Sequence, residues 1–250
     1  MSANFSIITV TYNAAGTLER TIRSVMEQNY PHIEYIVIDG GSSDSTRAII
    51  EKYKARIRIT VSEKDSGIYD AMNKGLTSAT GDYVWFINAG DTIYSPDTIT
   101  EIASQLKNLP GLPDIVYGET VIVNNKQEYL YIRRLKAPEK LSWHSFRDGM
   151  LISHQAFIVK RSIATAYDLH YRFSADYDWC IRCMKQARLI CNTHLILANY
   201  LDEGTTTRNL KASLKERFNI MCKYYGRIPT YLRHIKFALR FGLAKLTGKN

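Results

Sequence analysis

The feature that most constrains the fold of this chain is a regular alternation of apolar runs and helical patterns over its first 90 residues. Apolar runs, several rich in β-branched residues, occupy residues 5–12, 33–39, 57–62 and 83–87, and segments with helical spacing separate them at residues 14–29, 44–55 and 68–79. Buried parallel strands have this composition, and short helical crossovers join such strands with one handedness. The sequence therefore predicts an α/β fold with a mostly parallel, doubly wound, Rossmann-like central sheet flanked by helices.

A polar segment follows each of these predicted strands. The four segments are residues 11–13, 39–41, 62–67 and 88–91, and they consist mostly of Gly, Ser, Asp and Asn. In open α/β sheets, ligands bind beyond the carboxyl ends of the strands. We therefore expect these segments to line one binding crevice.

Beyond residue 91 the regular alternation ends. A helix is expected near residues 96–106, strands near 114–123 and 127–135, and a looser region through residues 153–161. A chain of 250 residues is at the upper end of what one domain usually holds. We interpret it as an α/β front half joined to a mixed half that completes a second binding surface, followed by a tail.

The sequence lacks the motifs of several common enzyme classes. The first turn, TYNAAGTLE, has one Gly where a dinucleotide-binding turn needs three, and neither a G-x-x-x-x-G-K-[ST] loop nor a G-x-S-x-G elbow occurs. A diphosphate can instead be neutralised by Mg²⁺ or Mn²⁺ held by one or two carboxylates. Asp91 is placed for that work after a buried strand, although an Asp after Gly also commonly caps a helix.

Four residues form a string that resembles a zinc motif. They are Cys180, Cys183, Cys191 and His194, with C-x2-C-x7-C-x2-H spacing. The first two cysteines lie in DYDWCIRCMKQA, which has helical spacing and no Gly or Pro to form a tight knuckle. We therefore expect buried thiols on a helix rather than zinc ligands.

Five segments in order point to a known family. SIITVTYN, IVIDGGSSDST, EKDSGIYDAMNKG, GDYVWFINAGD and SADYDWCIR together resemble the family 2 glycosyltransferases of the GT-A fold, especially a bacterial group associated with polysaccharide assembly. The resemblance extends over residues 5–200. It implies one domain at residues 1–204, with a nucleotide-sugar-binding half (1–110) and an acceptor-side half (111–204), followed by a basic helical tail at 205–250.

The resemblance assigns the nucleotide to the first half of the chain. The backbone of Val10, together with Tyr12 and Asp39, would hold the base, with Asp39 accepting from a uracil-like N–H. Asp65 would help to frame the nucleotide. These roles imply a nucleoside-diphosphate sugar as donor, most directly a UDP-sugar.

The family's acidic metal motif, Asp-x-Asp or Asp-x-Asp-Asp, aligns with Asn88-Ala89-Gly90-Asp91. Asp91 thus takes the metal-binding position for Mn²⁺ or Mg²⁺, whereas Asn88 and Gly90 replace the usual earlier carboxylates. A site with one carboxylate should bind the metal weakly until the nucleotide diphosphate supplies further ligands.

An acidic segment of the second half resembles the family's general-base motif. Asp176 matches the base that takes the proton of the acceptor hydroxyl, which implies an inverting displacement without a covalent intermediate. Asp178 lies about 200° further round a helix, so both carboxylates cannot face the same acceptor. Either one could instead simply favour the positive end of the helix dipole. His154 and Asp178 are possible contacts of the acceptor or donor sugar.

Together these features predict an inverting, metal-dependent glycosyltransferase that moves a sugar to a glycan or polyprenyl-linked acceptor in cell-surface polysaccharide synthesis. The alternative is a catalytically weak nucleotide- or carbohydrate-binding module of the same fold, which the reduced acidic motif allows. Retention of Asp91 and Asp176 favours the enzyme. The sequence has no RNA-binding strand with interleaved aromatic residues, so we expect no nucleic-acid partner.

The positive charge is concentrated in the tail. Residues 205–250 contain 11 Lys and Arg residues and one acidic residue, whereas residues 1–204 contain 22 basic and 23 acidic residues. An apolar stripe with helical spacing runs along the tail through Leu232, Ile235, Leu239, Leu243 and Leu246. With no leader or spanning segment in the sequence, we expect a cytoplasmic protein whose tail binds the anionic inner face of the membrane. The same stripe would also suit a helix packed on the domain.

Overall fold

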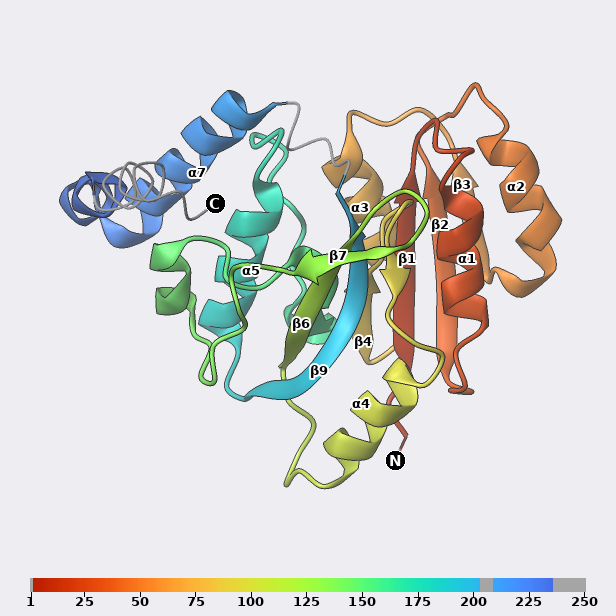
Figure 1. The fold of residues 1–250 in the computed structure, drawn as a ribbon, viewed down its shortest axis with the longest axis horizontal. Helices are drawn as coiled ribbons and strands as arrows, with labels where there is room; N and C mark the ends of the chain where they lie inside the picture. The colour runs from red at the N-terminus through yellow and green to blue at the C-terminus, as the bar shows by residue number, and fades with distance from the viewer. Residues whose placement is uncertain (1, 203–208, 236–250) are drawn as a thin grey trace.

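The computed structural model of the chain describes residues 2–202 and 209–235. Its first half contains strands and helices in alternation: β1 (Phe5–Thr11), α1 (Leu18–Met26), β2 (Ile33–Asp39), α2 (Thr46–Tyr53), β3 (Ile59–Ser62), α3 (Ile68–Ser78) and β4 (Tyr83–Phe86). β1 pairs in parallel with β2 and β4, and β2 pairs in parallel with β3. This parallel half lies on the right of Figure 1, and it confirms the order of elements predicted from the sequence.

Burial explains why this half folds as it does. All seven residues of β1 and all four of β4 are buried, as expected for parallel strands covered on both faces. On α1, the residues Leu18, Ile22 and Val25 form the buried stripe. α3 lies so close to the sheet that a Cβ atom on Gly75 would come within 2.5 Å of Ile8 Cγ2. The close packing of α3 therefore depends on glycine at this position.

The second half adds β5 (Thr92–Ile93), α4 (Thr98–Lys107), β6 (Ile115–Val123), β7 (Tyr129–Ile132), β8 (Phe157–Lys160), α5 (Ala175–Gln186) and β9 (Ile190–Leu201). The described residues form one nine-stranded sheet with the order β3-β2-β1-β4-β8-β6-β9-β5, and β7 pairs with β6 outside this path. β8 runs antiparallel to β4 and β6, whereas β9 runs parallel to β6. The sheet is mostly parallel, with a mixed second half, as the sequence predicts.

Several strands of the second half differ from the prediction, among them β5 and β8, which were not expected as strands. The strand expected over residues 127–135 is limited to β7, whose four residues are all exposed. The 12-residue β9 has no equivalent in the prediction, because its sequence, ICNTHLILANYL, shows no regular alternation. It is held as a continuous strand by pairing with β6 along one side and with β5 on the other.

The first helix of the tail, α7 (Leu210–Tyr225), packs on α5 at the left of Figure 1. The Glu216 carboxylate accepts hydrogen bonds from the backbone N–H groups of Arg172 and Phe173, at 2.9 and 2.8 Å. A further helical segment covers residues 227–235. In the parts of the chain that the structure describes, no helix is long and apolar enough to span a membrane. The predicted stripe residues Leu239, Leu243 and Leu246 lie outside these parts.

Candidate active site

The polar segments that follow β1, β2 and β3 meet at one edge of the sheet. The register of the parallel strands places Thr11 beside Asp39, and Asp39 beside Ser62. Asp65 reaches back to the same edge, since a Cβ atom on Gly40 would lie 2.3 Å from its Oδ2 atom. The structure therefore brings these predicted nucleotide-binding segments together.

Asp39 is fully buried, and its carboxylate orders the loop that follows it. The backbone N–H of Ser42 donates to both carboxylate oxygens at 3.2 Å, the Ser42 hydroxyl donates to Oδ1, and the Ser62 hydroxyl donates to Oδ2 at 2.6 Å. The Arg47 Nε atom lies 3.5 Å from Oδ2. Asp39 thus shapes the edge of the crevice, and its contact with a base stays a prediction.

The segment after β1 combines a buried strand end with an exposed ring. Val10 is buried and its carbonyl accepts a hydrogen bond from the Ala89 N–H at 3.1 Å, which joins β1 to the turn after β4. Tyr12 is 64% exposed, so its ring is accessible for stacking. The buried Thr11 hydroxyl has no hydrogen-bond partner among the described residues. These positions suit a flat polar ligand, and the contacts of Val10 and Tyr12 with a base stay predictions.

The turn after β4 carries the predicted metal position. Asp91 is 5% exposed, and burial raises the pKa of its carboxyl to about 7, while hydrogen bonds from the Leu201 N–H and the Gln155 side chain act in the opposite direction. These bonds measure 3.0 Å to Oδ1 and 2.7 Å to Oδ2. Asp91 therefore also ties the end of β9 and the segment before β8 to β4.

The same turn offers oxygen atoms suited to a hard divalent cation. The Asn88 Oδ1 atom is buried without a hydrogen-bond partner in the described residues, and each Asp91 oxygen keeps a free lone pair beside its single hydrogen bond. Within the described residues, no group of three or more His, Cys, Asp or Glu side chains could form a protein-only metal cage. Asn88 and Asp91 thus fit an ion that takes its remaining ligands from a diphosphate and water.

Asp176 lies in the first turn of α5 and is partly exposed. Its Oδ1 atom accepts hydrogen bonds from the Tyr69 hydroxyl at 3.1 Å and the Tyr177 N–H at 2.9 Å. No hydrogen bond from a described residue engages its Oδ2 atom. The carboxylate is therefore oriented through one oxygen, and the other is left for a ligand.

Tyr200, near the end of β9, connects the two acidic positions electrostatically. Burial raises the pKa of its phenol to about 12, and the charges of Asp91, Asp176 and Asp202 add to this rise. Because the charges of both Asp91 and Asp176 act on the same phenol, both carboxylates lie within electrostatic range of Tyr200.

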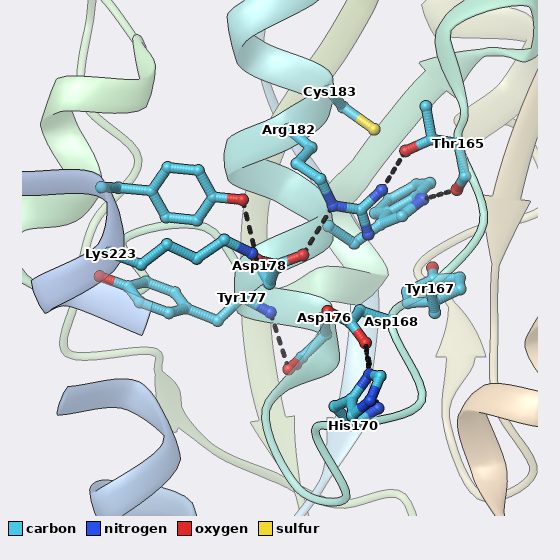
Figure 2. A network of polar contacts seen from close by, with 12 residues as sticks. Thr165, Tyr167, Asp168, His170, Asp176, Tyr177, Asp178, Arg182, Cys183 and Lys223 are labelled. Atoms are coloured by element: carbon cyan, nitrogen blue, oxygen red, sulfur yellow. Dashed lines mark hydrogen bonds and ion pairs between the residues drawn. The ribbon is translucent and has the colours of Figure 1, made fainter. Parts of the chain in front are cut away.

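Asp178 does not have the surroundings expected of an acceptor contact. It is fully buried on the face of α5 toward α7, and Figure 2 shows Arg182 and Lys223 directed at its carboxylate. The Arg182 Nε donates at 2.6 Å, the Lys223 ammonium at 3.0 Å and the Tyr224 hydroxyl at 2.8 Å. These three donors join α5 to α7 through Asp178 and favour its structural role, while its contact with a sugar stays a prediction.

His154 also lies in the interior rather than on the surface of the crevice. Its Nε2 atom shares a 2.7 Å hydrogen bond with the Tyr167 hydroxyl, and its ring packs against those of Phe86 and Trp179. Burial lowers the pKa of the imidazole to about 4, although the charge of Asp176 acts to raise it. The neutral ring is part of an aromatic cluster next to Asp176, and its contact with a sugar stays a prediction.

The helix predicted for DYDWCIRCMKQA is confirmed, and the thiols of Cys180 and Cys183 are both buried within α5. Burial raises the pKa of each thiol. Cys191 lies on β9, and the His194 side chain is 62% exposed. The four residues of the zinc-like string thus belong to two different elements.

Four residues around Asp176 were not predicted from the sequence: Tyr69, Arg133, Tyr200 and Arg217. Tyr69 stands inside a segment already singled out, EKDSGIYDAMNKG, so its neighbourhood was a usable signal. The other three come from regions without a recognisable motif. Only the fold brings them to the site.

Comparisons with known proteins agree with this arrangement. The model of the family "Glycosyl transferase family 2" matches residues 6–166. A PGL/p-HBAD biosynthesis glycosyltransferase of Mycobacterium bovis is 31% identical over 208 residues, which cover 80% of this chain and 77% of the relative. WfgD of Escherichia coli, a UDP-Glc:alpha-D-GlcNAc-diphosphoundecaprenol beta-1,3-glucosyltransferase, is 26% identical over 219 residues, 86% of this chain and 84% of the relative.

Solved structures show the same fold. Residues 1–349 of S. aureus TarS superpose with a TM-score of 0.70 at 17% identity, over 96% of this chain and 74% of that one. The same portion of TarS in complex with UDP-GlcNAc gives a TM-score of 0.70 at 18% identity, over 87% of this chain and 64% of that one. With the family model matching residues 6–166 and a relative that is 31% identical over 80% of this chain, the chain belongs to glycosyl transferase family 2 and is a glycosyltransferase of the GT-A fold.

Proposed function

We propose that this glycosyltransferase moves a sugar from a UDP-sugar, with inversion at the anomeric carbon, to a hydroxyl group of a lipid-linked glycan. The observation that carries the proposal is the state of Asp176, whose Oδ1 is held by Tyr69 and the Tyr177 N–H while its Oδ2 has no hydrogen bond from a described residue. A general base needs this combination of fixed orientation and a free oxygen.

In the proposed reaction, the acceptor hydroxyl donates a hydrogen bond to Asp176 Oδ2. As the hydroxyl oxygen attacks the anomeric carbon, its proton passes to this carboxylate and the bond from the anomeric carbon to the diphosphate oxygen breaks. The Tyr69 hydroxyl holds the carboxylate in place, since it donates to the other oxygen. One direct displacement inverts the anomeric configuration and leaves no sugar attached to the protein.

The donor is assigned to the opposite side of the crevice. The exposed ring of Tyr12 and the buried edge at Asp39 suit the uracil and ribose, and Asp65 frames the same pocket. Asn88 and Asp91 would hold Mn²⁺ or Mg²⁺, which when bound neutralises the negative charge of the departing diphosphate. The TarS complexes with UDP and UDP-GlcNAc support a uridine nucleotide in this fold.

The names of relatives support the acceptor class. WfgD is named for transfer to a sugar on diphosphoundecaprenol, and the mycobacterial relative is named for PGL/p-HBAD biosynthesis. We extend a lipid-linked or glycan acceptor to this chain on that basis.

Titration of UDP with and without Mn²⁺, together with transfer assays, tests the donor and metal assignments. We expect Asp91→Asn to lose nearly all transfer and to bind UDP more weakly in Mn²⁺, because it removes the acidic group of the turn. Asp97→Asn is the matched control, since its carboxylate accepts an exposed hydrogen bond from Asn29 away from the crevice. Near-normal Mn²⁺-dependent turnover of Asp91→Asn would refute the metal assignment.

The alternative function is a catalytically weak nucleotide- or carbohydrate-binding module. It is favoured by the replacement of two family carboxylates by Asn88 and Gly90. Hydrolysis of UDP-sugars, compared with and without Mn²⁺ and with a panel of acceptors, separates the two functions. UDP binding without any hydrolysis or transfer would support the module.

We also propose that the tail attaches the enzyme to the anionic inner face of the cytoplasmic membrane. Ile228, Tyr231, Leu232 and Ile235 of the helical segment 227–235 are each more than half exposed. Exposed apolar groups next to basic residues suit a lipid surface. The division of the chain at residue 204 remains part of this proposal.

Co-sedimentation with vesicles tests the tail. The full chain should bind anionic vesicles at low salt and lose much of this binding at high salt. A chain truncated after Tyr225 keeps α7 and should lose most of the binding. Equal binding by the two chains would remove the tail from the proposal.

A further inference from the structure

An exposed apolar stretch in the second half of the chain takes no part in the proposed reaction. It consists of β7 and the residues that follow it, and its apolar side chains are between 42% and 62% exposed: Tyr129, Leu130, Tyr131, Ile132 and Leu135. We call residues 129–136 the β7 arm. Single exposed apolar residues are normal in soluble domains, whereas a contiguous group of them marks a surface that binds a partner or a membrane. The β7 arm therefore indicates a binding surface.

The β7 arm is exposed beside a strand that is buried. β7 pairs with the last three residues of β6, which are Val121, Ile122 and Val123, and all three are buried. In the described ranges, β6 is the only strand that pairs with β7, and no helix or strand is drawn over β7 in Figure 1. Successive side chains of a strand point to opposite faces of the sheet, so apolar groups of β7 reach solvent on both faces.

The charges of the β7 arm favour an anionic partner. Arg134 and Lys136 are both exposed, no ion pair of the described residues includes either, and no acidic residue occurs within residues 129–136. Tyrosine rings, aliphatic groups and basic side chains together suit the headgroup region of an anionic bilayer. A second copy of this chain would instead bring the same cations into the contact, where they would repel each other. An anionic lipid surface is therefore the occupant that the arm fits best.

The β7 arm and the helical segment 227–235 are attached to one short stretch of the chain. Within the arm, the Arg133 guanidinium donates to the backbone carbonyls of Met150 and Leu151, the latter at 2.7 Å. Two residues before Met150, the Asp148 carboxylate pairs with Arg233 of segment 227–235. Because residues 148–151 join the arm to this segment, the two exposed apolar groups lie close enough for one flat lipid surface to contact both.

We propose that the β7 arm is a second membrane contact, which places its tyrosine and aliphatic side chains in the headgroup region of an anionic bilayer. The inference rests on the proposed function for its partner, the inner face of the cytoplasmic membrane, but the arm is a site separate from the tail. A tail alone tethers the enzyme, whereas two contacts on different elements also fix its orientation. Every bound molecule would then present its active site to lipid-linked acceptors in the same way.

Co-sedimentation of the full chain with vesicles of phosphatidylglycerol and phosphatidylcholine in equal parts tests the arm. Leu130→Ser/Ile132→Ser should weaken vesicle binding about fivefold or more, because it removes apolar surface from the contact. The matched control is Leu112→Ser/Leu189→Ser, which changes side chains that are 38% and 40% exposed just before β6 and β9, at the opposite end of β6 from β7. The control should bind vesicles like the wild type, and both variants should match the wild type in UDP affinity and thermal unfolding. Equal vesicle binding by the arm variant and the wild type would overturn the proposal.

Fluorescence quenching tests directly whether the arm enters the bilayer. Tyr131→Trp introduces a tryptophan into the arm, and lipids with brominated acyl chains should quench its emission in the vesicle-bound full chain. Leu112→Trp is the control and should be quenched no more than the three natural tryptophans. Similar quenching at the two positions would contradict the proposal. A wild-type dimer in solution that Leu130→Ser/Ile132→Ser converts to a monomer would assign the arm to a second copy and would also overturn it.

A variant of the tail separates this proposal from the proposed function. Ile228→Ser/Leu232→Ser changes exposed apolar side chains of segment 227–235 and leaves the arm intact. Vesicle binding that falls only in the tail variant would keep the tail and overturn the arm, whereas a fall only in the arm variant would support the arm and remove the tail. A fall in each variant supports both contacts. An enzyme that binds vesicles through the arm but transfers no sugar would support the arm and remove the proposed reaction.

Discussion

Asp176 and Asp178 lie two residues apart on different faces of α5, and their hydrogen-bond partners and exposure differ. On the face toward the crevice, Asp176 is partly exposed and accepts hydrogen bonds from neutral donors through one oxygen. On the face toward α7, Asp178 is fully buried and accepts from Arg182, Lys223 and Tyr224. Among the described residues, Asp176 thus keeps one oxygen free, whereas both oxygens of Asp178 already accept hydrogen bonds.

The comparison shows that the packing of the neighbouring element decides what each carboxylate can do. α7 supplies Asp178 with a cation, the ammonium group of Lys223. Burial acts to lower the pKa of this ammonium, but the hydrogen bond and charge of Asp178 outweigh burial and raise it. A buried anion kept with its cations contributes to folding but has no oxygen left for a substrate. Asp176 lacks such a partner, so its negative charge remains available to take a proton.

The largest expected effect comes from Asp176→Asn, which should lower turnover by about 10² to 10⁴, the usual contribution of a general base. Binding of UDP and the free energy of unfolding should stay close to wild type, because an amide oxygen can still accept from Tyr69 and the Tyr177 N–H. Steady-state kinetics check the fall in turnover, and thermal unfolding of the same preparation checks that the stability is unchanged. A dead Asp178→Asn beside an active Asp176→Asn would reverse the comparison.

Asp178→Asn should have the opposite profile. It leaves the Lys223 and Arg182 side chains without their anion, and we expect a loss of about 2–3 kcal/mol in the free energy of unfolding, less than for a fully enclosed pair because both cations reach solvent. Turnover per folded molecule should change little. Urea unfolding measures the loss.

Asp168→Asn is the matched control for Asp178→Asn. Asp168 accepts from the exposed His170 ring, as Figure 2 shows, and an exposed pair contributes little. Its loss in unfolding free energy should stay below about 1 kcal/mol. An equal loss in both variants would mean that burial does not distinguish the two sites.

The sequence predicts the parallel half well because each element there is encoded locally. The runs at β1 and β4 are buried throughout, and the polar turns follow them directly, so the edge of the sheet where these turns meet can be located from strand ends alone. The roles of Asp176 and Asp178 are harder to separate, since spacing shows only that they face different ways. Which of them meets α7 depends on a helix that begins 32 residues after Asp178, at Leu210. Long-range packing of this kind leaves no local pattern.

A third ionisable residue, His154, makes the stability of the fold depend on pH. The neutral His154 has a pKa of about 4 in the fold, against 6.5 for an exposed imidazole. Between these values the unfolded chain binds the proton more tightly, so stability present above pH 6.5 is lost as the pH falls toward 4. From pH 7.5 to pH 5 this loss is about 2 kcal/mol.

His154→Gln tests this loss, because glutamine can keep the hydrogen bond to Tyr167 but does not titrate. Urea unfolding at several pH values should show a shallower decline for the variant than for the wild type over this range. The exposed His170, changed to Gln, is the control and should leave the slope unaltered. Parallel curves for wild type and His154→Gln would show that His154 does not contribute to the acid sensitivity.

The smallest effect concerns the hydrogen bond that orients Asp176. Tyr69→Phe removes the hydroxyl that donates to Oδ1 but keeps the ring, which stacks on Tyr167 at a centroid distance of 5.6 Å. The Tyr177 N–H remains as a second donor, so the carboxylate is loosened rather than released. A hydrogen bond to a charged group is equivalent to about 1.5–3 kcal/mol. Because the second donor remains, we expect a smaller loss of about 1 kcal/mol, which corresponds to a fall in turnover of about fivefold. Tyr53→Phe removes an equivalent bond, from a Tyr hydroxyl on α2 to the Glu19 carboxylate on α1 at 2.7 Å, and should leave turnover unchanged. A similar loss in both variants would indicate a general effect of removing a hydroxyl. A loss confined to Tyr69→Phe would show that turnover depends on the hydrogen bond that holds Oδ1 of Asp176 in place and so orients its free Oδ2.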